Sequence, residues 1–418
     1  MDIYNLVSFA GIFILIGFAW LLSTDKKNMN WRVIGWGIGL QILIALFIFV
    51  VPAGAKLFLV VNDVVVKILD SASAGAKFVF GPLAETGEKS LGFILAFQAF
   101  PTIIFFSALI AILYYFGVMN LIIRGFAYIF TKLMRISGAE SLATASNIFV
   151  GVEANLTIKP YLARMTQSEM CTVLTAGMAT IASNVLALYV FSLKDVFPTI
   201  GGHLVSASLL SAPAALVMSK VILPEGEAPE TLGIHVRPFY EKEKTLFEAI
   251  INGADAGVKM IVGIVALLIA ILGLVALVDL CLASLGAWSL KTICGYLFYP
   301  FTIILGVPLS DAGIVSRIIG ERLIVTEVVS YNDLAAALKE NLLQHPRSAV
   351  IATYALCGFA HLASMAIFVG GVCALAPDKV RNIGGVAIRA LIAATLACLQ
   401  TACVAGTFFT KGSILLGD

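Results

Sequence analysis

Two stretches of this chain combine carboxylates with helix-breaking residues inside otherwise apolar sequence. The first, residues 146–156, contains Asn147 and Glu153, and the second, residues 306–328, contains Glu327. Gly, Pro and Asn interrupt both stretches too often for either to form one clean membrane-spanning helix. A carboxylate in lipid is costly unless it faces a cavity or a partner. Matched interruptions in the two halves of a chain therefore predict a solute-binding site between them.

The first stretch, together with the polar run at residues 180–184, offers hard oxygen atoms. Asn147 and Thr180 carry side-chain oxygens, and Val150 and Ile181 lie where backbone carbonyls would be free of helical hydrogen bonds. Several such oxygens near one point suit a cation, and we predict a Na⁺ site. The alternative is that Asn147 and Thr180 only cap helix breaks.

Glu153 and Glu327 occupy corresponding apolar settings in the two halves. A carboxylate can accept hydrogen bonds from hydroxyl groups or ring N–H groups of a solute. The alternative is a structural salt bridge, for instance from Glu327 to Arg317 or Arg322. Because the acids are matched, we expect solute binding.

A second break, at residues 357–361, brings further candidates. His361 lies in this break, Ser364 follows one turn later on the same helix face, and Phe359 could stack on an aromatic ring. Val152 and Val185 flank the polar runs and could line the same cavity. For each of these residues, plain packing inside the protein is the alternative.

Composition excludes most soluble functions. Of 418 residues, 60% are hydrophobic and only 12% are charged, against about 25% charged in soluble domains. The chain is therefore expected to be an all-α polytopic membrane protein. A net charge of +2 without a clustered basic face gives no reason to expect nucleic acid as a partner. Without a glycine-rich phosphate loop or a HExxH motif, ATP drive and a zinc site are not expected.

Hydropathy predicts eight spans and two re-entrant hairpins. The expected spans are residues 4–22, 33–51, 93–119, 170–196, 201–223, 258–285, 349–375 and 383–410. The hairpins fall within residues 140–163 and 290–344, and residues 55–80 read as an amphipathic helix at the membrane interface.

Basic residues collect on the cytoplasmic side, so the loop at residues 224–244 is expected inside and both termini outside. The first hairpin then enters from inside and the second from outside, which is the pattern of an inverted repeat. We expect five segments: scaffold spans and interfacial helix (1–135), first hairpin and broken span (136–196), spans joined by the cytoplasmic loop (197–289), second hairpin and broken span (290–376), and the last span (377–418).

Several motifs resemble those of the concentrative nucleoside transporter family. They are Asn-Ile-Phe-Val-Gly at 147–151, Gly-Val-Pro at 306–308, Ala-Leu-Cys-Gly-Phe-Ala at 355–360, and the run beginning Phe-Pro-Thr at 100–109. The resemblance covers nearly the whole chain. It implies a homotrimer of Na⁺- or H⁺-driven symporters in the inner membrane, each with a scaffold part and a moving, elevator-type transport part.

The resemblance also assigns roles to residues. Glu153 matches the first-hairpin acid, Glu327 the acid that binds ribose, and Phe359 and Ser364 match residues near the solute. The residues that match the family's sodium ligands are Asn147, Val150, Thr180 and Ile181.

The departures from the family pattern lie in the binding site. Val152 stands where the family has Gln-Thr, Asn155 replaces a Pro, Thr326 replaces an Asn, and His361 replaces the Asn used on ribose. A Leu-Ser pair at 309–310 replaces Trp-Asn. These departures indicate an unusual nucleoside, or a different small polar metabolite, as the solute.

The leading hypothesis is therefore a cation-coupled nucleoside importer. The alternatives are an importer of another small polar metabolite, a channel or receptor, and an intramembrane enzyme using Glu153, Glu327 and His361 for acid–base chemistry. Paired inverted hairpins argue against an enzyme, since an enzyme does not need access from both sides.

Overall fold

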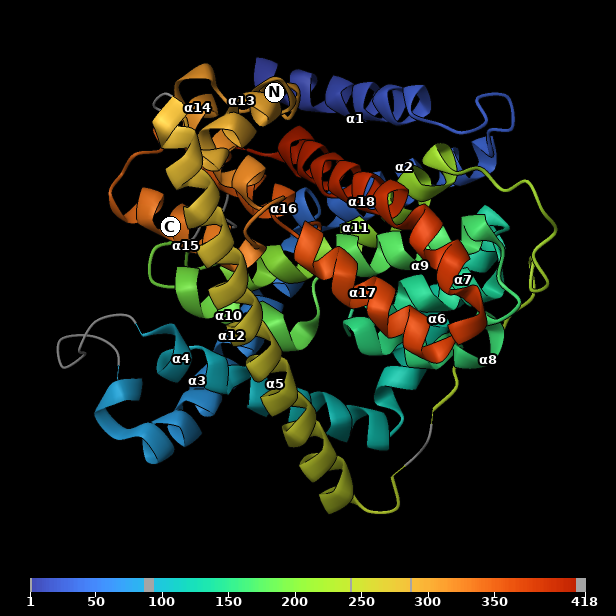
Figure 1. Ribbon diagram of the computed structural model, residues 1–418, viewed down its shortest axis with the longest axis horizontal. Coiled ribbons are helices and arrows are strands. Elements are labelled where there is room, and N and C mark those ends of the chain that lie inside the picture. Colours follow the sequence, from blue (N-terminus) through green and yellow to red (C-terminus); the bar gives the residue numbers. More distant parts are fainter. Residues whose placement is uncertain (1, 86–93, 241–242, 286–287, 411–418) are drawn as a thin grey trace.

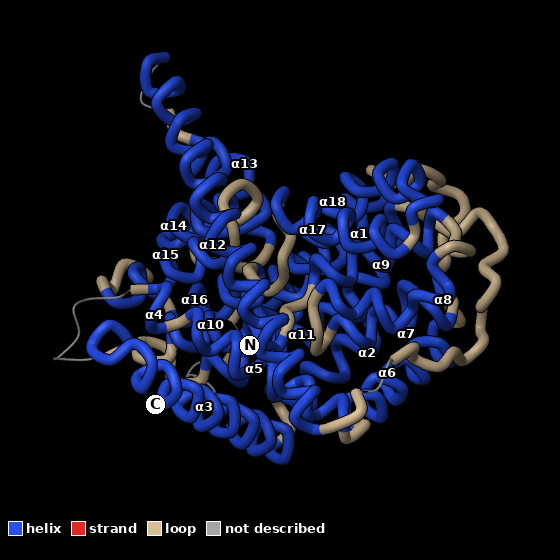
Figure 2. The backbone as a smooth tube through the Cα atoms, turned by 60° about the horizontal axis from the view of Figure 1, so that its bottom comes forward, coloured by secondary structure: helices blue, strands red, loops and turns tan. Residues whose placement is uncertain are grey.

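The protein is described by a computed structural model covering residues 2–85, 94–240, 243–285 and 288–410, and within these ranges it is all-helical. Figures 1 and 2 show helices packed into a broad bundle, with the N-terminal α1 along one edge. Phe93, where the third span was expected to begin, and parts of the expected segments 224–244 and 377–418 lie outside the described residues.

The first half contains the helices α1 (Ile3–Leu21), α2 (Trp31–Phe49), α3 (Pro52–Phe80), η1 (Gly81–Ala84), α4 (Leu95–Gln98), α5 (Phe100–Tyr115), α6 (Val118–Met134), α7 (Gly138–Asn147), η2 (Val152–Ile158), α8 (Lys159–Leu162), α9 (Gln167–Ala179), α10 (Ser183–Leu193) and α11 (Ile200–Ile222). The second half contains α12 (Leu246–Leu285), α13 (Leu290–Ile304), α14 (Leu309–Glu321), α15 (Glu327–Lys339), α16 (Pro346–Ala355), α17 (Leu362–Leu375), η3 (Pro377–Lys379) and α18 (Val380–Phe408).

Among the described residues, seven helices or helix pairs are long and apolar enough to cross a membrane. They correspond to seven of the eight expected spans. The eighth, expected at 349–375, is divided into α16 and α17, and α17 alone is a shorter apolar helix. The expected break in this span is therefore confirmed, as is the break between α9 and α10.

Three helix boundaries differ from the sequence prediction. The third span ends at Tyr115, because Gly117 takes a left-handed conformation (φ 76°) and a new helix, α6, begins. The helix expected at 258–285 begins twelve residues earlier, at Leu246. The region expected as one hairpin at 290–344 contains a separate helix, α13, before the hairpin of α14 and α15.

The two halves repeat one backbone contact. In the first half the N–H of Ser183, where α10 begins, donates to the Phe149 carbonyl at the hairpin tip (2.9 Å). In the second half the N–H of Leu362, where α17 begins, donates to the Leu323 carbonyl at the other tip (3.2 Å). Each hairpin tip thus satisfies a donor exposed by the broken span that follows it.

The two broken spans cross at their breaks. Gly358 has φ 109°, and a Cβ there would lie 2.7 Å from the backbone of Ala179, the last residue of α9. Only glycine fits this combination of left-handed backbone and close approach. The crossing brings both breaks, and the hairpin tips bonded to them, to the middle of the molecule.

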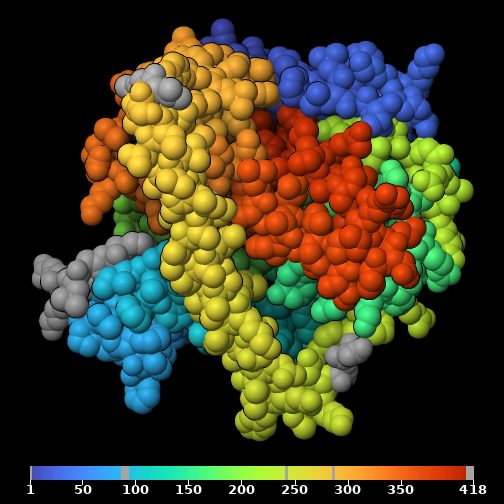
Figure 3. Space-filling view, in the orientation of Figure 1, coloured from blue at the N-terminus to red at the C-terminus, as the bar shows by residue number. Residues whose placement is uncertain are grey.

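Burial separates an inner from an outer part. The apolar windows of α9–α10 and α11 are 89% buried, whereas that of α12 is 0% buried. Figure 3 shows α12 as a ridge crossing one face of the molecule. The inner helices carry the breaks, and α12 passes over them.

Candidate functional site

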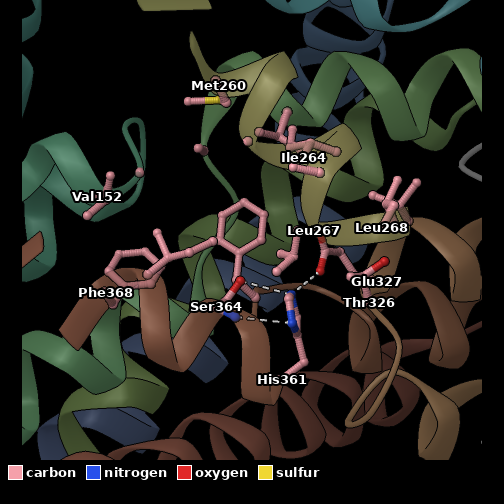
Figure 4. A pocket seen from close by; sticks show the side chains of 18 of the residues that line it. Val152, Met260, Ile264, Leu267, Leu268, Thr326, Glu327, His361, Ser364 and Phe368 are labelled. Atoms are coloured by element: carbon pink, nitrogen blue, oxygen red, sulfur yellow. Dashed lines mark hydrogen bonds and ion pairs between the residues drawn. The ribbon is translucent and has the colours of Figure 1, made fainter. Parts of the chain in front are cut away.

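All seven side chains expected at a solute site line one cavity of about 720 Å³. They are Val152, Glu153, Val185, Glu327, Phe359, His361 and Ser364. The cavity lies between both hairpins, both broken spans and α12. Figure 4 shows Val152 on one side and Glu327 on the other, with Met260 of α12 across from His361 and Ser364. A volume of this size suits a small organic solute.

Glu327 is the centre of the polar end of the cavity. Its Oε1 accepts a hydrogen bond from the Tyr189 hydroxyl at 2.6 Å, and its Oε2 lies 2.6 Å from His361 Nε2. Glu327 is also the first residue of α15, where the helix dipole stabilises a negative charge. The carboxylate is therefore held in place, and each oxygen keeps a second lone pair for a solute donor.

The tautomer of His361 follows from its role as the N-cap of α17. Its Nδ1 accepts a hydrogen bond from the backbone N–H of Ser364 (3.2 Å), so Nδ1 carries no proton. The proton of the neutral imidazole is therefore on Nε2, which lies 2.6 Å from Glu327 Oε2 and 2.9 Å from the Ser364 hydroxyl (Figure 4). This leaves the Ser364 O–H free to donate into the cavity.

The salt bridge considered as an alternative for Glu327 is wrong within the described residues, since neither Arg317 nor Arg322 pairs with it. Arg322 is buried and donates to the Ala355 carbonyl at the end of α16 (2.5 Å). A guanidinium there compensates a carbonyl that the helix break leaves without an intrahelical partner.

Glu153 differs from Glu327 in having no hydrogen bond or ion pair with any residue in the described part of the chain. It lies in η2 and lines both the main cavity and a neighbouring cavity of about 420 Å³. Val152 beside it packs toward α17, because a Cβ on Gly371 would meet its side chain at 2.6 Å. Glu153 is thus an acceptor at the less polar end without a donor from another residue of the described chain.

The four residues expected to bind a cation lie at the first hairpin tip and the first broken span. Asn147 is buried at the end of α7, and its Oδ1 has no hydrogen-bond partner among the described residues. Thr180 Oγ1 donates to the Ala176 carbonyl (2.8 Å), which leaves its lone pairs free. In the same part of the chain, the carbonyls of Val150 and Ile181 accept no backbone hydrogen bond.

The bond from Ser183 to Phe149 ties the tip that holds Val150 to the break that holds Ile181. A buried amide oxygen without a donor normally destabilises a protein by about 1–3 kcal/mol. These residues therefore fit a hard cation, which would supply the missing positive charge. None of Asn147, Thr180 and Ile181 lines the main cavity. The next residue after Val150, Gly151, and the next after Ile181, Ala182, do line it.

Sequence reasoning missed several residues of the site. Tyr189 bonds Glu327 across 138 residues of sequence, and Phe368 lies 6.4 Å from Phe359, ring to ring. Residues of α12, including Met260, form a whole wall of the cavity. Tyr189 follows Val185 by four residues on one helix face, so helical spacing alone would have proposed it.

Comparisons with known proteins agree with this geometry. Residues 203–406 match the model described as Na⁺ dependent nucleoside transporter C-terminus, residues 10–83 match that described as Na⁺ dependent nucleoside transporter N-terminus, and residues 96–195 match "Gate: Nucleoside recognition". An uncharacterized transporter of Haemophilus influenzae is 36% identical over 98% of this chain and 99% of its own length.

The chain belongs to the concentrative nucleoside transporter family. Solute carrier family 28 member 3 of mouse is 37% identical over 96% of this chain, and the match spans 58% of that relative. The chain thus spans about three-fifths of the length of the mammalian relatives that it matches.

Solved structures of the family extend the comparison. CNTnw in an inward-facing substrate-bound state is 33% identical, with a TM-score of 0.92 over 99% of this chain and 100% of that one. A CNTnw variant in an outward-facing state has a TM-score of 0.88 over 97% of this chain and 98% of that one. The elevator-type, multi-pass fold of the family is therefore the fold of this chain, which is more similar to the inward-facing of the two structures.

Proposed function

We propose that this protein is a cation-coupled symporter, driven by Na⁺, that imports nucleosides across the inner membrane by alternating access. The observation that carries the proposal is the cluster of Glu327, His361, Ser364 and Tyr189 inside a cavity walled by both hairpins and both broken spans. Several relatives are named sodium/nucleoside cotransporters, which supports the same function here.

The polar cluster suits the sugar of a nucleoside. Vicinal hydroxyls can donate to the free lone pairs of Glu327 and accept from the Ser364 hydroxyl. The opposite end is lined by Val152, Val185 and Phe359, which suit the flat face of a base. Glu153 is the acceptor available there for a ring or exocyclic N–H.

Cation coupling is inferred from the orphaned oxygen of Asn147 beside Thr180 and the two free carbonyls. A bound Na⁺ would supply positive charge where these oxygens meet. Because the tip and the broken span are joined there, we infer that the cation organises the first hairpin for solute binding. H⁺ remains the other candidate coupling ion.

Alternating access and assembly are further parts of the proposal. CNTnw structures are known in inward-facing, outward-facing and intermediate states, which supports movement of a transport part holding both hairpins (residues 136–196 and 290–376) against a scaffold. A homotrimer is supported by α12, because none of its apolar window is buried within the single chain. We infer that both termini face the periplasm or cell exterior.

Uptake of radiolabelled uridine into proteoliposomes tests the function. We expect accumulation driven by an inward Na⁺ gradient and none with K⁺ in its place. Accumulation that follows only a proton gradient would replace Na⁺ by H⁺. Gradient-independent equilibration would support a channel, and chemical conversion of the nucleoside without uptake would support an enzyme.

If uridine is not accumulated, the second candidate is an importer of another small polar metabolite. Binding of such metabolites in the cavity tests it. The same fold would then import a different small solute, as the departures at Val152 and His361 allow.

A further inference from the structure

A separate cavity of about 290 Å³ lies between α6 and the connection from α11 to α12, and it shares no lining residue with the solute cavity. Arg124, Tyr128 and Thr131 of α6 face His235 and Arg237 of the connection across it. No acidic residue lines this cavity in the part of the chain that the structure describes. The solute site uses none of these side chains.

The connection is fixed where it forms the cavity. The N–H of Gly138 donates to the Thr231 carbonyl (2.8 Å), and the N–H of Gly233 donates to the Ile136 carbonyl (3.1 Å). Next to them the His235 and Tyr128 rings stack with centroids 4.6 Å apart. Figure 1 shows the connection running down the outer edge of the molecule. The cavity is thus an ordered pocket rather than a chance gap beside a loose loop.

Two guanidinium groups in this pocket have no protein partner. Arg124 and Arg237 form no hydrogen bond or ion pair with a residue in the described ranges. By contrast, Glu230 on the same connection is paired with Arg164 at 2.6 Å. Lys132, one turn beyond Tyr128 on α6, donates to the Tyr128 hydroxyl (3.0 Å) and adds a third positive charge. Unpaired guanidinium groups with an aromatic wall favour a phosphate group.

The exposed surface of α6 has two neighbouring stripes. Arg124, Tyr128 and Lys132 recur every four residues and form a basic stripe. Ile122 and Ile129, together with Val118, form an exposed apolar stripe beside it. In a membrane protein this arrangement places a helix in the interface, with its apolar face among acyl chains and its basic face at the headgroups.

We propose that this pocket binds the headgroup of an anionic phospholipid, with the phosphate on Arg124 and Arg237 and the acyl chains along the apolar stripe of α6. The lipid would join α6 to the connection that is bonded to the base of the first hairpin. Free phosphate shares the headgroup chemistry but cannot use the apolar stripe, so we commit to the lipid.

The test is titration of the purified full-length protein, in neutral detergent, with phosphatidylglycerol, phosphatidylcholine and inorganic phosphate separately. Retained lipid is counted by native mass spectrometry, and thermal stability is measured in parallel. We expect phosphatidylglycerol to be retained and to raise the melting temperature, and phosphatidylcholine to do neither. The double variant Arg124→Gln/Arg237→Gln should bind phosphatidylglycerol at least about tenfold more weakly. The reason is that each basic residue near an anionic lipid surface contributes roughly fivefold in affinity.

Two further variants keep the result interpretable. Arg389→Gln removes an exposed guanidinium on α18 that bonds only a carbonyl of its own helix (3.4 Å), and should leave retention unchanged. Arg124→Lys/Arg237→Lys keeps the charge and should retain more lipid than the Gln pair. Equal retention of both phospholipids, equal loss in Arg389→Gln, or full stabilisation by inorganic phosphate alone would each overturn the proposal. None of these outcomes depends on nucleoside uptake.

Discussion

Replacing Glu327 by Gln should weaken nucleoside binding sharply. One carboxylate oxygen accepts a hydrogen bond from the Tyr189 hydroxyl at 2.6 Å, and the other lies 2.6 Å from His361 Nε2. A Gln amide has one acceptor oxygen and one NH₂ group, so one of the two contacts loses its acceptor, and only the Tyr189 hydroxyl can turn to accept from the NH₂ group. The variant therefore loses the charge that binds solute hydroxyls and also disturbs the cluster that positions it.

The magnitude follows from the bonds lost. A hydrogen bond to a charged group contributes about 1.5–3 kcal/mol, which corresponds to roughly 10- to 150-fold in affinity. Equilibrium binding of uridine to the detergent-purified protein at fixed Na⁺ measures this change. Glu321→Gln is the matched control, because Glu321 lies in the same hairpin but pairs with Lys291 (2.8 Å) and does not line the cavity.

A double-mutant cycle tests whether the His361 contact is part of the effect. An Asn at 361 can turn its oxygen toward the Gln amide and accept a hydrogen bond from it, so Glu327→Gln and His361→Asn should be non-additive. If Glu327→Gln binds uridine as tightly as the parent, or if both Glu variants lose affinity equally, Glu327 is not a solute ligand and the reasoning fails.

Three further predictions follow. Thr180→Val should raise the Na⁺ concentration needed for uptake by about tenfold or more, whereas the matched change Thr175→Val, inside the preceding helix α9, should not; identical Na⁺ activation curves would remove Thr180 from the cation site. Gly358→Ala should lower the melting temperature, because its Cβ would lie 2.7 Å from the backbone of α9 at φ 109°; an unchanged melting temperature would contradict the crossing of the two breaks. Tyr189→Phe should weaken uridine binding with unchanged Na⁺ activation, while Tyr331→Phe, which loses a hydroxyl that donates to the Thr353 carbonyl (3.1 Å), should leave binding intact; equal losses would mean that the bond to Glu327 has no special role in binding.

The hairpins and breaks could be predicted because they depend on local chemistry. Gly, Pro and polar residues inside apolar runs disrupt helices wherever they occur. The division between α5 and α6 was missed because the sequence stays apolar across it, and only the left-handed backbone of Gly117 ends the helix. The early start of α12 was missed because its first turns contain Glu248 and Asp255, which obscure an apolar span.

The residues that line the site could be predicted more fully than their hydrogen-bond partners. The seven side chains expected at a solute site come from both hairpins and both broken spans, and they line one cavity. The partners of Glu327 depend on how α10 and α15 pack, which no local pattern encodes. For the same reason the sequence could offer Arg322 only as a possible partner of a carboxylate, whereas it donates to the Ala355 carbonyl that the broken helix leaves exposed.

The uneven distribution of polar groups in the cavity leads to a prediction about selectivity. Glu327, His361 and Ser364 gather at one end, whereas Val152 brings no side-chain hydrogen bond to the other. A site that binds hydroxyls discriminates strongly against solutes that lack them, while an apolar wall discriminates weakly. We therefore expect uridine and adenosine to compete for uptake within about tenfold of each other, and 3′-deoxyuridine to compete at least about tenfold less well than uridine. A preference for uridine over adenosine of more than about a hundredfold would contradict weak discrimination at the Val152 end of the cavity, and equal competition by the deoxy analogue would exclude the polar cluster as the sugar site.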